Sequence, residues 1–206
     1  MVCPIVITGP IGAGKSTICH LLSKCLKCDY IKEYIDLPNG DAMLDDFKKG
    51  TITSEFFQDY ILNCFETQLK CAKSKIVVME RLPEEGSIIF SGSDEKLLKK
   101  AKLLQSEFGI AGADSMNVSV ILNKNLTPNQ LLKIILLMIF NKETVTKNDL
   151  IEFSNTEGII IYLKTDEDTC LSRIQKRGRQ PELGITKDDM KKMNEIYDNY
   201  LLGRTK

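Results

Sequence analysis

A glycine-rich stretch near the amino terminus contains the residues that most clearly predict a chemical function. Gly9-x4-Gly14-Lys15-Ser16 matches the pattern G-x-x-x-x-G-K-[ST] in full. In such a loop, successive backbone N–H groups curl around phosphate oxygens, the lysine adds a positive charge, and the serine hydroxyl can bind Mg²⁺. We predict that the loop binds the phosphates of a nucleoside triphosphate with magnesium, through Gly9, Gly12, Ala13, Gly14, Lys15, Ser16 and Thr17.

Three arginines near the carboxyl terminus form a second candidate phosphate site. Arg173, Arg177 and Arg179 lie within seven residues of each other, and guanidinium groups form strong, often bidentate hydrogen bonds with phosphoryl oxygens. A segment that closes over the transferred phosphate would concentrate them on the charge that develops there. We predict such a lid over residues 167–185. The alternative is an ordinary basic helix end, where the helix dipole favours arginine.

Two glutamates and an arginine follow predicted strands. Glu33 lies near the end of one strand, and Glu80 and Arg81 end another. Because His20 is the only histidine, we expect any general base to be a carboxylate. We predict that Glu33 accepts a hydroxyl proton, that Glu80 joins Ser16 in binding Mg²⁺, and that Arg81 binds the acceptor or the incoming phosphate. The alternative for Glu33 is an ordinary exposed loop acid.

Apolar patterning predicts the elements that bring these residues together. Short apolar runs between turns indicate buried strands, and longer runs with helical spacing indicate amphipathic helices. Strands that alternate with helices form a parallel sheet covered on both faces, and ligands bind at the carboxyl ends of its strands. The predicted strands are 2–8, 28–35, 75–81, 157–166 and, with a weaker pattern, 117–125; the predicted helices are 15–26, 54–73, 95–108, 128–140, 166–178 and 186–202.

Composition limits the class of protein. The chain has 206 residues, and its 28 basic and 28 acidic residues give no formal net charge. Balanced charge does not favour nucleic acid or an anionic membrane as a partner, and the apolar segment 131–140 is too short to span a bilayer, so it is interpreted as a buried helix. Seven irregularly spaced cysteines and no recognisable signal peptide predict free thiols and a cytoplasmic protein. We predict one domain, 1–206, with an unassigned, insertion-like region at 91–156.

Together these motifs resemble the deoxyribonucleoside kinase family over residues 1–90 and 157–202. The most specific likeness is YLKTDEDTCLSRIQKRGRQPELGI (162–185), and FFQDYIL (56–62) and Glu80-Arg81 add to it. The resemblance implies an α/β P-loop kinase fold, with a central parallel β-sheet flanked by helices on both faces and an Arg-rich lid. It also implies transfer of the γ-phosphate of ATP to the 5′-hydroxyl of a deoxynucleoside, and a homodimer.

The resemblance implies roles for individual residues. Glu33 corresponds to the base that takes the 5′-hydroxyl proton, with Arg81 as its positioning partner. Gln58 corresponds to the amide that pairs with the nucleobase, and Phe57 and Phe90 flank that base. The remaining counterparts are Glu80 on the magnesium side, Glu182 for the sugar 3′-hydroxyl, and Arg173, Arg177 and Arg179 for the phosphates.

The chain departs from the family pattern at several positions. Tyr34 stands where the family often has proline, and Leu82-Pro83 follows Glu-Arg in place of serine. Gly86 falls where many members carry a base-reading aspartate, and the segment FKKGTITSEF lacks the family's sugar-binding tyrosine. The family also has a further strand and a loop that holds the adenine of ATP after the helix that follows the lid. We therefore expect the sheet to be one strand short.

Other functions share part of this pattern. A nucleoside monophosphate kinase of the thymidylate type shares the loop, lid and sheet, but its anionic acceptor would face Glu33 and Glu182. A non-catalytic nucleotide-binding paralogue would bind ATP without transferring phosphate. A GTPase switch carries a guanine-reading Asn-Lys-x-Asp motif; Asn123-Lys124-Asn125 approaches it, but Leu126 replaces the aspartate. We interpret that stretch as a loop after a strand.

Overall fold

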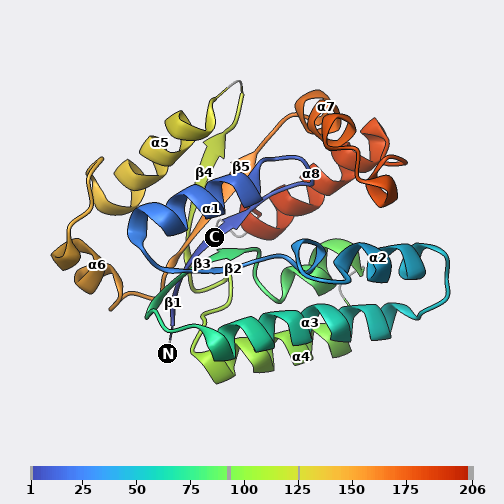
Figure 1. Cartoon of the computed structure of the whole chain (residues 1–206), viewed down its shortest axis with the longest axis horizontal. Helices are drawn as coiled ribbons and strands as arrows, with labels where there is room; N and C mark the ends of the chain where they lie inside the picture. Colours follow the sequence, from blue (N-terminus) through green and yellow to red (C-terminus); the bar gives the residue numbers. More distant parts are fainter. Residues whose placement is uncertain (1, 92–93, 125, 204–206) are drawn as a thin grey trace.

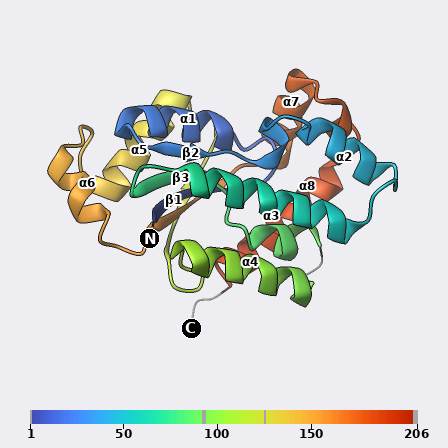
Figure 2. The ribbon, with the colours of Figure 1, turned by 60° about the horizontal axis from the view of Figure 1, so that its bottom comes forward.

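A parallel five-stranded sheet forms the centre of the molecule. The computed structural model describes residues 2–91, 94–124 and 126–203, and within them the strand order is β2-β3-β1-β5-β4. Helices lie around the sheet in both views (Figures 1 and 2). The predicted α/β class and parallel sheet are confirmed. The strands are β1 (Cys3–Thr8), β2 (Asp29–Ile31), β3 (Ile76–Glu80), β4 (Asn117–Leu122) and β5 (Ile159–Lys164).

Most of the described helices fall where the sequence pattern predicts them. Thr127 and Thr186 cap the starts of two of them, each by accepting a hydrogen bond from a backbone N–H of the first turn. Two short helices, α2 and α6, were not predicted. The described helices are α1 (Lys15–Leu26), α2 (Gly40–Lys48), α3 (Ser54–Cys71), α4 (Glu95–Phe108), α5 (Pro128–Phe140), α6 (Lys147–Phe153), α7 (Glu167–Arg177) and α8 (Lys187–Leu201).

Both faces of the sheet are buried, as the continuous apolar strands require. Val6 of β1 belongs to a core cluster that also contains residues of α3, α4 and α8. Its neighbours Ile5 and Ile7 point to the opposite face, into a cluster formed with α1 and α5. Successive side chains of a strand alternate between faces, so this division places helices on both sides and leaves the strand ends open for a ligand.

The buried face of α3 differs from the predicted one at a single position. Apolar spacing in this segment predicts that Phe56 shares a face with Phe65 and Leu69. Phe65 and Leu69 are buried, whereas Phe56 is 57% exposed and its neighbour Phe57 is 4% exposed. The ring of Phe57 stacks on Phe47 of α2, with centroids 4.6 Å apart. Because α2 was not predicted, the surface that buries Phe57 could not be anticipated from the sequence of α3 alone.

The region 91–156 completes the sheet. β4 pairs in parallel with β5 from Asn117↔Ile159 to Leu122↔Lys164, and it forms the edge of the sheet (Figure 1). The sequence led us to expect a sheet one strand short, with this region unassigned. The structure corrects that expectation, because the strand beside β5 comes from this region.

The apolar helix α5 is buried on one side only. Leu131, Ile135 and Leu136 are buried, whereas Leu137 is 44% exposed and Met138 is also exposed. The interpretation of 131–140 as a buried helix is therefore correct for one face and wrong for the other. No helix of the described residues has both the length and the apolar character needed to cross a bilayer.

We expect replacement of Ile135 by alanine to destabilise the protein by about 2–5 kcal/mol, because the lost side chain leaves a cavity between α5 and the sheet. Its side chain is 0% exposed. Leu137→Ala in the same helix should change the free energy of unfolding by less than about 0.5 kcal/mol. Urea unfolding followed by circular dichroism measures both. Equal effects would show that α5 does not pack on the sheet as described.

Candidate active site

A cavity of about 900 Å³ lies where the predicted chemistry-bearing segments meet. It receives the loop after β1, the segments that follow β2, β3 and β4, and part of the segment from α7 to α8. All the site residues predicted from the sequence line it except Gly9. The phosphate loop, Glu33, Glu80 and Arg81 lie at the carboxyl ends of β1, β2 and β3, as expected.

Gly9 allows two strands of the sheet to pack closely. Its φ of 141° lies in a region that favours glycine, and a Cβ at this position would lie 2.6 Å from the backbone oxygen of Leu163. Any side chain would push β1 and β5 apart, so this glycine allows the close approach of two strands. Because Gly9 does not line the cavity, the structure adds nothing to its predicted role in phosphate binding.

The rest of the loop is shaped for close approach by a ligand. Gly12 and Gly14 have φ of 82° and 95°. A Cβ on Gly12 would lie 2.6 Å from the backbone oxygen of Cys170, so α7 packs directly against the loop. Helix α1 begins at Lys15, and its first turn contains no acidic side chain. The positive end of its dipole is therefore left for an anion.

Lys15 is buried between the loop and β3. Its ammonium donates to the backbone oxygen of Pro10 at 3.1 Å and lies 3.8 Å from Oε1 of Glu80. Burial, and then the nearby charge of Arg81, lowers the pKa of Lys15. Both effects favour a bound anion, because phosphate oxygens would replace lost hydration and balance the two cations.

Arg81, which is buried, forms an ion pair at the centre of the site with Glu33, whose side chain is 17% exposed. Nε of Arg81 lies 3.0 Å from Oε1 of Glu33, close enough for an ion pair although the two groups are not aligned as a hydrogen bond. The same guanidinium donates to the hydroxyl of Tyr197. Arg81 also has a φ of 71°, a backbone conformation that non-glycine residues rarely adopt and that is often kept where function requires it.

The surroundings of Glu33 keep its carboxylate charged. Burial raises the pKa of Glu33, but the cations Arg81 and Lys15 more than offset this effect, so its pKa falls below the ordinary value. A carboxylate that stays ionised at neutral pH can accept a hydrogen bond or a proton from a bound hydroxyl.

The pKa of Glu80 shifts in the opposite direction from that of Glu33. Burial, and then the negative charge of Glu33, raises the pKa of Glu80 to about 7. Its carboxylate accepts hydrogen bonds from Ser16 at 3.1 Å and from Tyr30 at 2.9 Å. A hard cation with oxygen ligands fits this place, because it would compensate the two neighbouring carboxylates. Ser16 and Glu80 thus suit the predicted Mg²⁺.

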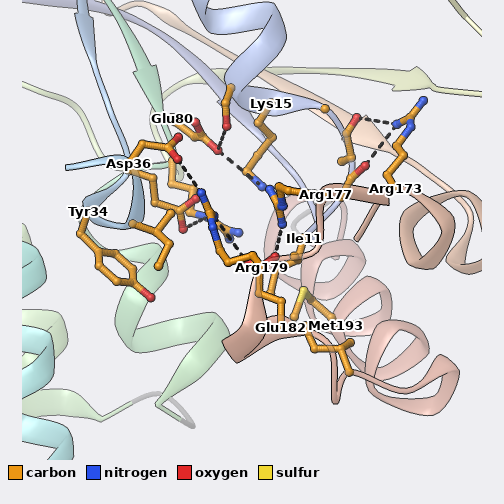
Figure 3. Close-up of a pocket in the computed structure, with 18 of the residues that line it drawn as sticks. Ile11, Lys15, Tyr34, Asp36, Glu80, Arg173, Arg177, Arg179, Glu182 and Met193 are labelled. Carbon is orange, nitrogen blue, oxygen red and sulfur yellow. Dashed lines mark hydrogen bonds and ion pairs between the residues drawn. The ribbon is translucent and has the colours of Figure 1, made fainter. Parts of the chain in front are cut away.

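The arginines of the predicted lid are held by acidic residues and by the loop. Arg177 and Arg179 both pair with Glu182, and Arg179 also donates to Asp36 at 2.8 Å. Nη1 of Arg173 donates to the backbone oxygens of Gly12 and Ala13 (Figure 3). The structure therefore brings the three arginines to the cavity, and it places them in contacts that a phosphate would have to replace.

The side of the cavity formed by α3 is aromatic and contains one amide. Phe57 and Gln58 are buried there, and Phe90 lies with its ring 4.9 Å from the guanidinium carbon of Arg81. A Cβ on Gly86 would lie 2.8 Å from Oε1 of Gln58. The glycine therefore leaves the Gln58 amide room that any side chain at position 86 would reduce.

Several residues of the site were missed by reasoning from the sequence. Tyr197 donates to Glu85 at 3.2 Å as well as receiving the Arg81 hydrogen bond, so α8 supports the centre of the site. Asn123 was assigned to an ordinary loop, yet it donates to the backbone oxygen of Ala13 at 2.9 Å. The only signals for these residues were a tyrosine in an otherwise amphipathic helix and the incomplete Asn-Lys-x-Asp stretch.

Comparison with known proteins shows the family to which the chain belongs. A family described as an AAA domain matches residues 5–194, and the chain belongs to that family. Deoxyguanosine kinase of Bacillus subtilis is 27% identical over 195 residues, which cover 94% of this chain and 76% of the relative. Deoxyadenosine/deoxycytidine kinase of the same organism is 23% identical over 202 residues, which cover 97% and 76%.

Solved structures share the fold. Deoxyadenosine kinase from M. mycoides with bound dATP has a TM-score of 0.55 at 24% identity, and the match covers 98% of this chain and 86% of that chain. The same kinase with bound dCTP gives 0.52 at 25% identity, with coverage of 97% and 83%. The P-loop kinase fold and the resemblance to deoxyribonucleoside kinases, which are ATP-dependent phosphotransferases, are confirmed.

We predict that Glu80→Gln stabilises the free protein more at pH 8 than at pH 5.5. Because the folded pKa of Glu80, about 7, lies above its ordinary value, its contribution to stability is present at low pH and is lost as pH rises through 7. The neutral amide should remove a cost of about 1–3 kcal/mol at pH 8. Urea unfolding without Mg²⁺ or nucleotide measures it.

The matched control is Glu152→Gln, which changes an exposed glutamate of α6. Its unfolding free energy should follow the parent protein at both pH values. If Glu80→Gln behaves in the same way as this control, Glu80 does not carry the burial cost that the structure implies.

Proposed function

We propose that the protein is a magnesium-dependent deoxyribonucleoside kinase, which transfers the γ-phosphate of ATP to the 5′-hydroxyl of a deoxynucleoside. The observation that carries the proposal is the charged Glu33 carboxylate, paired with Arg81 in the same cavity as the phosphate loop. A base beside a phosphate site suits a hydroxyl acceptor. The names of the relatives support the choice of substrate, since they include deoxyguanosine, deoxyadenosine and deoxycytidine kinases.

The donor phosphates would occupy the loop at the start of α1. Backbone N–H groups of residues 12–17 and the ammonium of Lys15 would bind them, and Lys15 would exchange its contact with the Pro10 carbonyl for phosphate oxygens. Mg²⁺, held by Ser16 and Glu80, would supply charge compensation for the β- and γ-phosphates. Catalysis then rests on positioning and electrostatic stabilisation, which dominate phosphoryl transfer.

The acceptor would bind beside Glu33. Its 5′-hydroxyl proton passes to the Glu33 carboxylate, the 5′-oxygen forms a bond to the γ-phosphorus, and the bond from that phosphorus to the β–γ bridging oxygen breaks, which releases ADP. Arg81 orients the Glu33 carboxylate and keeps it ionised. Its guanidinium is fixed in turn by Tyr197. The proton-transfer role makes Glu33 the residue on which the acceptor depends most.

The nucleobase would lie between Phe57 and Phe90, with its edge at Gln58. An amide offers both donors and an acceptor, so Gln58 can pair with a base edge. Glu182 would accept a hydrogen bond from the sugar 3′-hydroxyl. Arg177 and Arg179 both pair with Glu182 in the free protein. On binding of the substrates, some of their N–H groups would donate hydrogen bonds to the transferred phosphate, as expected of a lid.

The first test is transfer of radiolabelled phosphate from ATP to four deoxynucleosides and four deoxynucleoside monophosphates, with Mg²⁺. We expect label on nucleosides and a loss of about 10²–10⁴-fold in kcat for Glu33→Gln, because the amide cannot take the proton. ATP affinity should stay within about threefold, since Glu33 does not contact the donor-binding loop in this proposal.

Two results would contradict the proposal in different ways. Label on monophosphates would place the protein among nucleoside monophosphate kinases and give Glu33 a structural role. ATP binding with no transfer to any acceptor would identify a nucleotide-binding protein without kinase activity.

We also expect Gln58→Leu to raise the KM for the preferred deoxynucleoside by about tenfold or more, because the base edge would lose its hydrogen-bond partner. The KM for ATP should be unchanged. The control is Asn63→Leu, which removes an amide from the exposed side of the same helix. Steady-state kinetics with each substrate varied separately would show the split. An equal rise for ATP and nucleoside would mean that Gln58 supports the fold and does not read the base.

A further inference from the structure

We propose that Glu85 is a positioning residue for the transfer reaction: through Tyr197 it holds Arg81 in place while Glu33 takes the proton of the acceptor hydroxyl. The proposal rests on the proposed function in one respect, the proton transfer to Glu33. Neither Glu85 nor Tyr197 lines the cavity, and Glu85 is 0% exposed. Any effect of Glu85 on a substrate must therefore pass through other residues.

Glu85 is joined by hydrogen bonds to three separate parts of the molecule. Its Oε2 accepts from the hydroxyl of Thr8 at 2.6 Å and from that of Tyr197 at 3.2 Å. Its Oε1 accepts from the backbone N–H of Leu82 at 3.0 Å. Thr8 ends β1 directly before the phosphate loop, Leu82 follows Arg81, and Tyr197 belongs to α8. All three partners donate, which suits an ionised carboxylate because it only accepts hydrogen bonds.

The hydroxyl of Tyr197 links Glu85 to Arg81. A guanidinium only donates hydrogen bonds, so this hydroxyl accepts from Arg81 and its single proton is left for Glu85. The three groups form a row with a positive charge at one end and a negative charge at the other. Charge-assisted hydrogen bonds are stronger than neutral ones, and linked bonds polarise one another. Glu85 thus fixes the direction of the Tyr197 hydroxyl and, with it, the place of the guanidinium.

A second anion near Arg81 matters because the first loses its charge in the reaction. Glu33 lies 3.0 Å from Nε of Arg81 in the free protein. When its carboxylate accepts the 5′-hydroxyl proton it becomes neutral, and a buried guanidinium that loses its anionic partner is costly. Glu85 does not meet the acceptor, so it keeps its contact with Tyr197 throughout. It is the group that would keep Arg81 in place during the transfer.

The charges around Arg81 agree with this division. Burial lowers the pKa of Arg81, but Glu33, Tyr197 and Glu85 are among the groups that raise it above its ordinary value. Both carboxylates therefore act on the same cation. One of them is reached by the substrate, and the other is not.

A neighbouring pair provides a matched comparison. Glu84 is also buried, and it accepts a hydrogen bond from the hydroxyl of Tyr200 at 2.8 Å. Tyr200 lies on α8 one turn after Tyr197. This pair joins the same helix to the same segment after β3, but its hydrogen bond does not involve Arg81. If Glu85 served the fold alone, its loss would have the same kind of effect as the loss of this pair.

The first test measures phosphate transfer by the full chain and its variants at saturating ATP and Mg²⁺. We expect Tyr197→Phe and Glu85→Gln each to lower kcat by about tenfold or more, because Arg81 is no longer held in its productive place. ATP affinity should stay within about threefold. The variant with both changes should lose little more than Tyr197→Phe alone, since both act through the same row of hydrogen bonds. Tyr200→Phe, the control, should keep kcat within about twofold.

The second test locates Arg81 by crystallography of the free protein and needs no transfer. In Glu33→Gln the guanidinium should still donate to the Tyr197 hydroxyl. In Tyr197→Phe it should lie about 1 Å or more from its place in the parent protein, a displacement large enough to impair catalysis. In Tyr200→Phe it should not move. Circular dichroism shows whether each variant is folded.

Three results would overturn the proposal. They are a guanidinium that leaves Tyr197 in Glu33→Gln, one that keeps its place in Tyr197→Phe, and kcat values that Tyr197→Phe and Glu85→Gln lower no more than Tyr200→Phe does. Failure of the proposed function gives a different result. If the parent protein phosphorylates no acceptor, the kinase reaction is lost, and the crystal positions alone decide whether Glu85 and Tyr197 hold Arg81.

Discussion

The ion pair between Arg81 and Glu33 is the interaction on which the site depends. A buried charge is tolerated only when other groups compensate it, and here each charged group sets the state of the next. Arg81 keeps Glu33 ionised, and the charge of Glu33 in turn helps to raise the pKa of Glu80. Lys15 completes this cluster beneath the phosphate loop. The cluster therefore combines the cations Arg81 and Lys15 with two carboxylates of different pKa. Glu33 is ionised and can accept a proton. Glu80 has a raised pKa, and a bound metal ion would favour its ionised form.

The sheet makes this cluster possible because it brings distant parts of the chain to one edge. β1 lies between β3 and β5, so the phosphate loop stands next to Glu80 and Arg81 on one side and next to α7 on the other. Packing on both faces holds the strands in register, and Gly9 lets β1 and β5 approach closely. The region 91–156 extends the same arrangement, since β4 carries Asn123 to the outer side of the loop.

Much of this was predictable because the signals are local. The phosphate loop is a contiguous motif, the strands are apolar runs, and Glu33, Glu80 and Arg81 follow strands directly, so a parallel sheet brings them together. What the sequence did not indicate depends on long-range packing. Tyr197 contacts Arg81, which lies 116 residues earlier in the chain, and Phe57 is buried against Phe47 of α2, a helix that was not predicted. Asn123 contacts Ala13, which lies 110 positions earlier in the chain, so its incomplete Asn-Lys-x-Asp stretch did not indicate this contact.

The most direct test of the account is a crystal structure of the protein with a deoxynucleoside, Mg²⁺ and a non-hydrolysable ATP analogue. It would locate the acceptor hydroxyl relative to the pair formed by Glu33 and Arg81. The account predicts the 5′-oxygen within about 2.6–3.2 Å of a Glu33 carboxylate oxygen, in line with the γ-phosphorus, with Arg81 still paired to Glu33. A 5′-oxygen held elsewhere, with Glu33 bound only to Arg81, would contradict it and show that the ion pair serves stability alone.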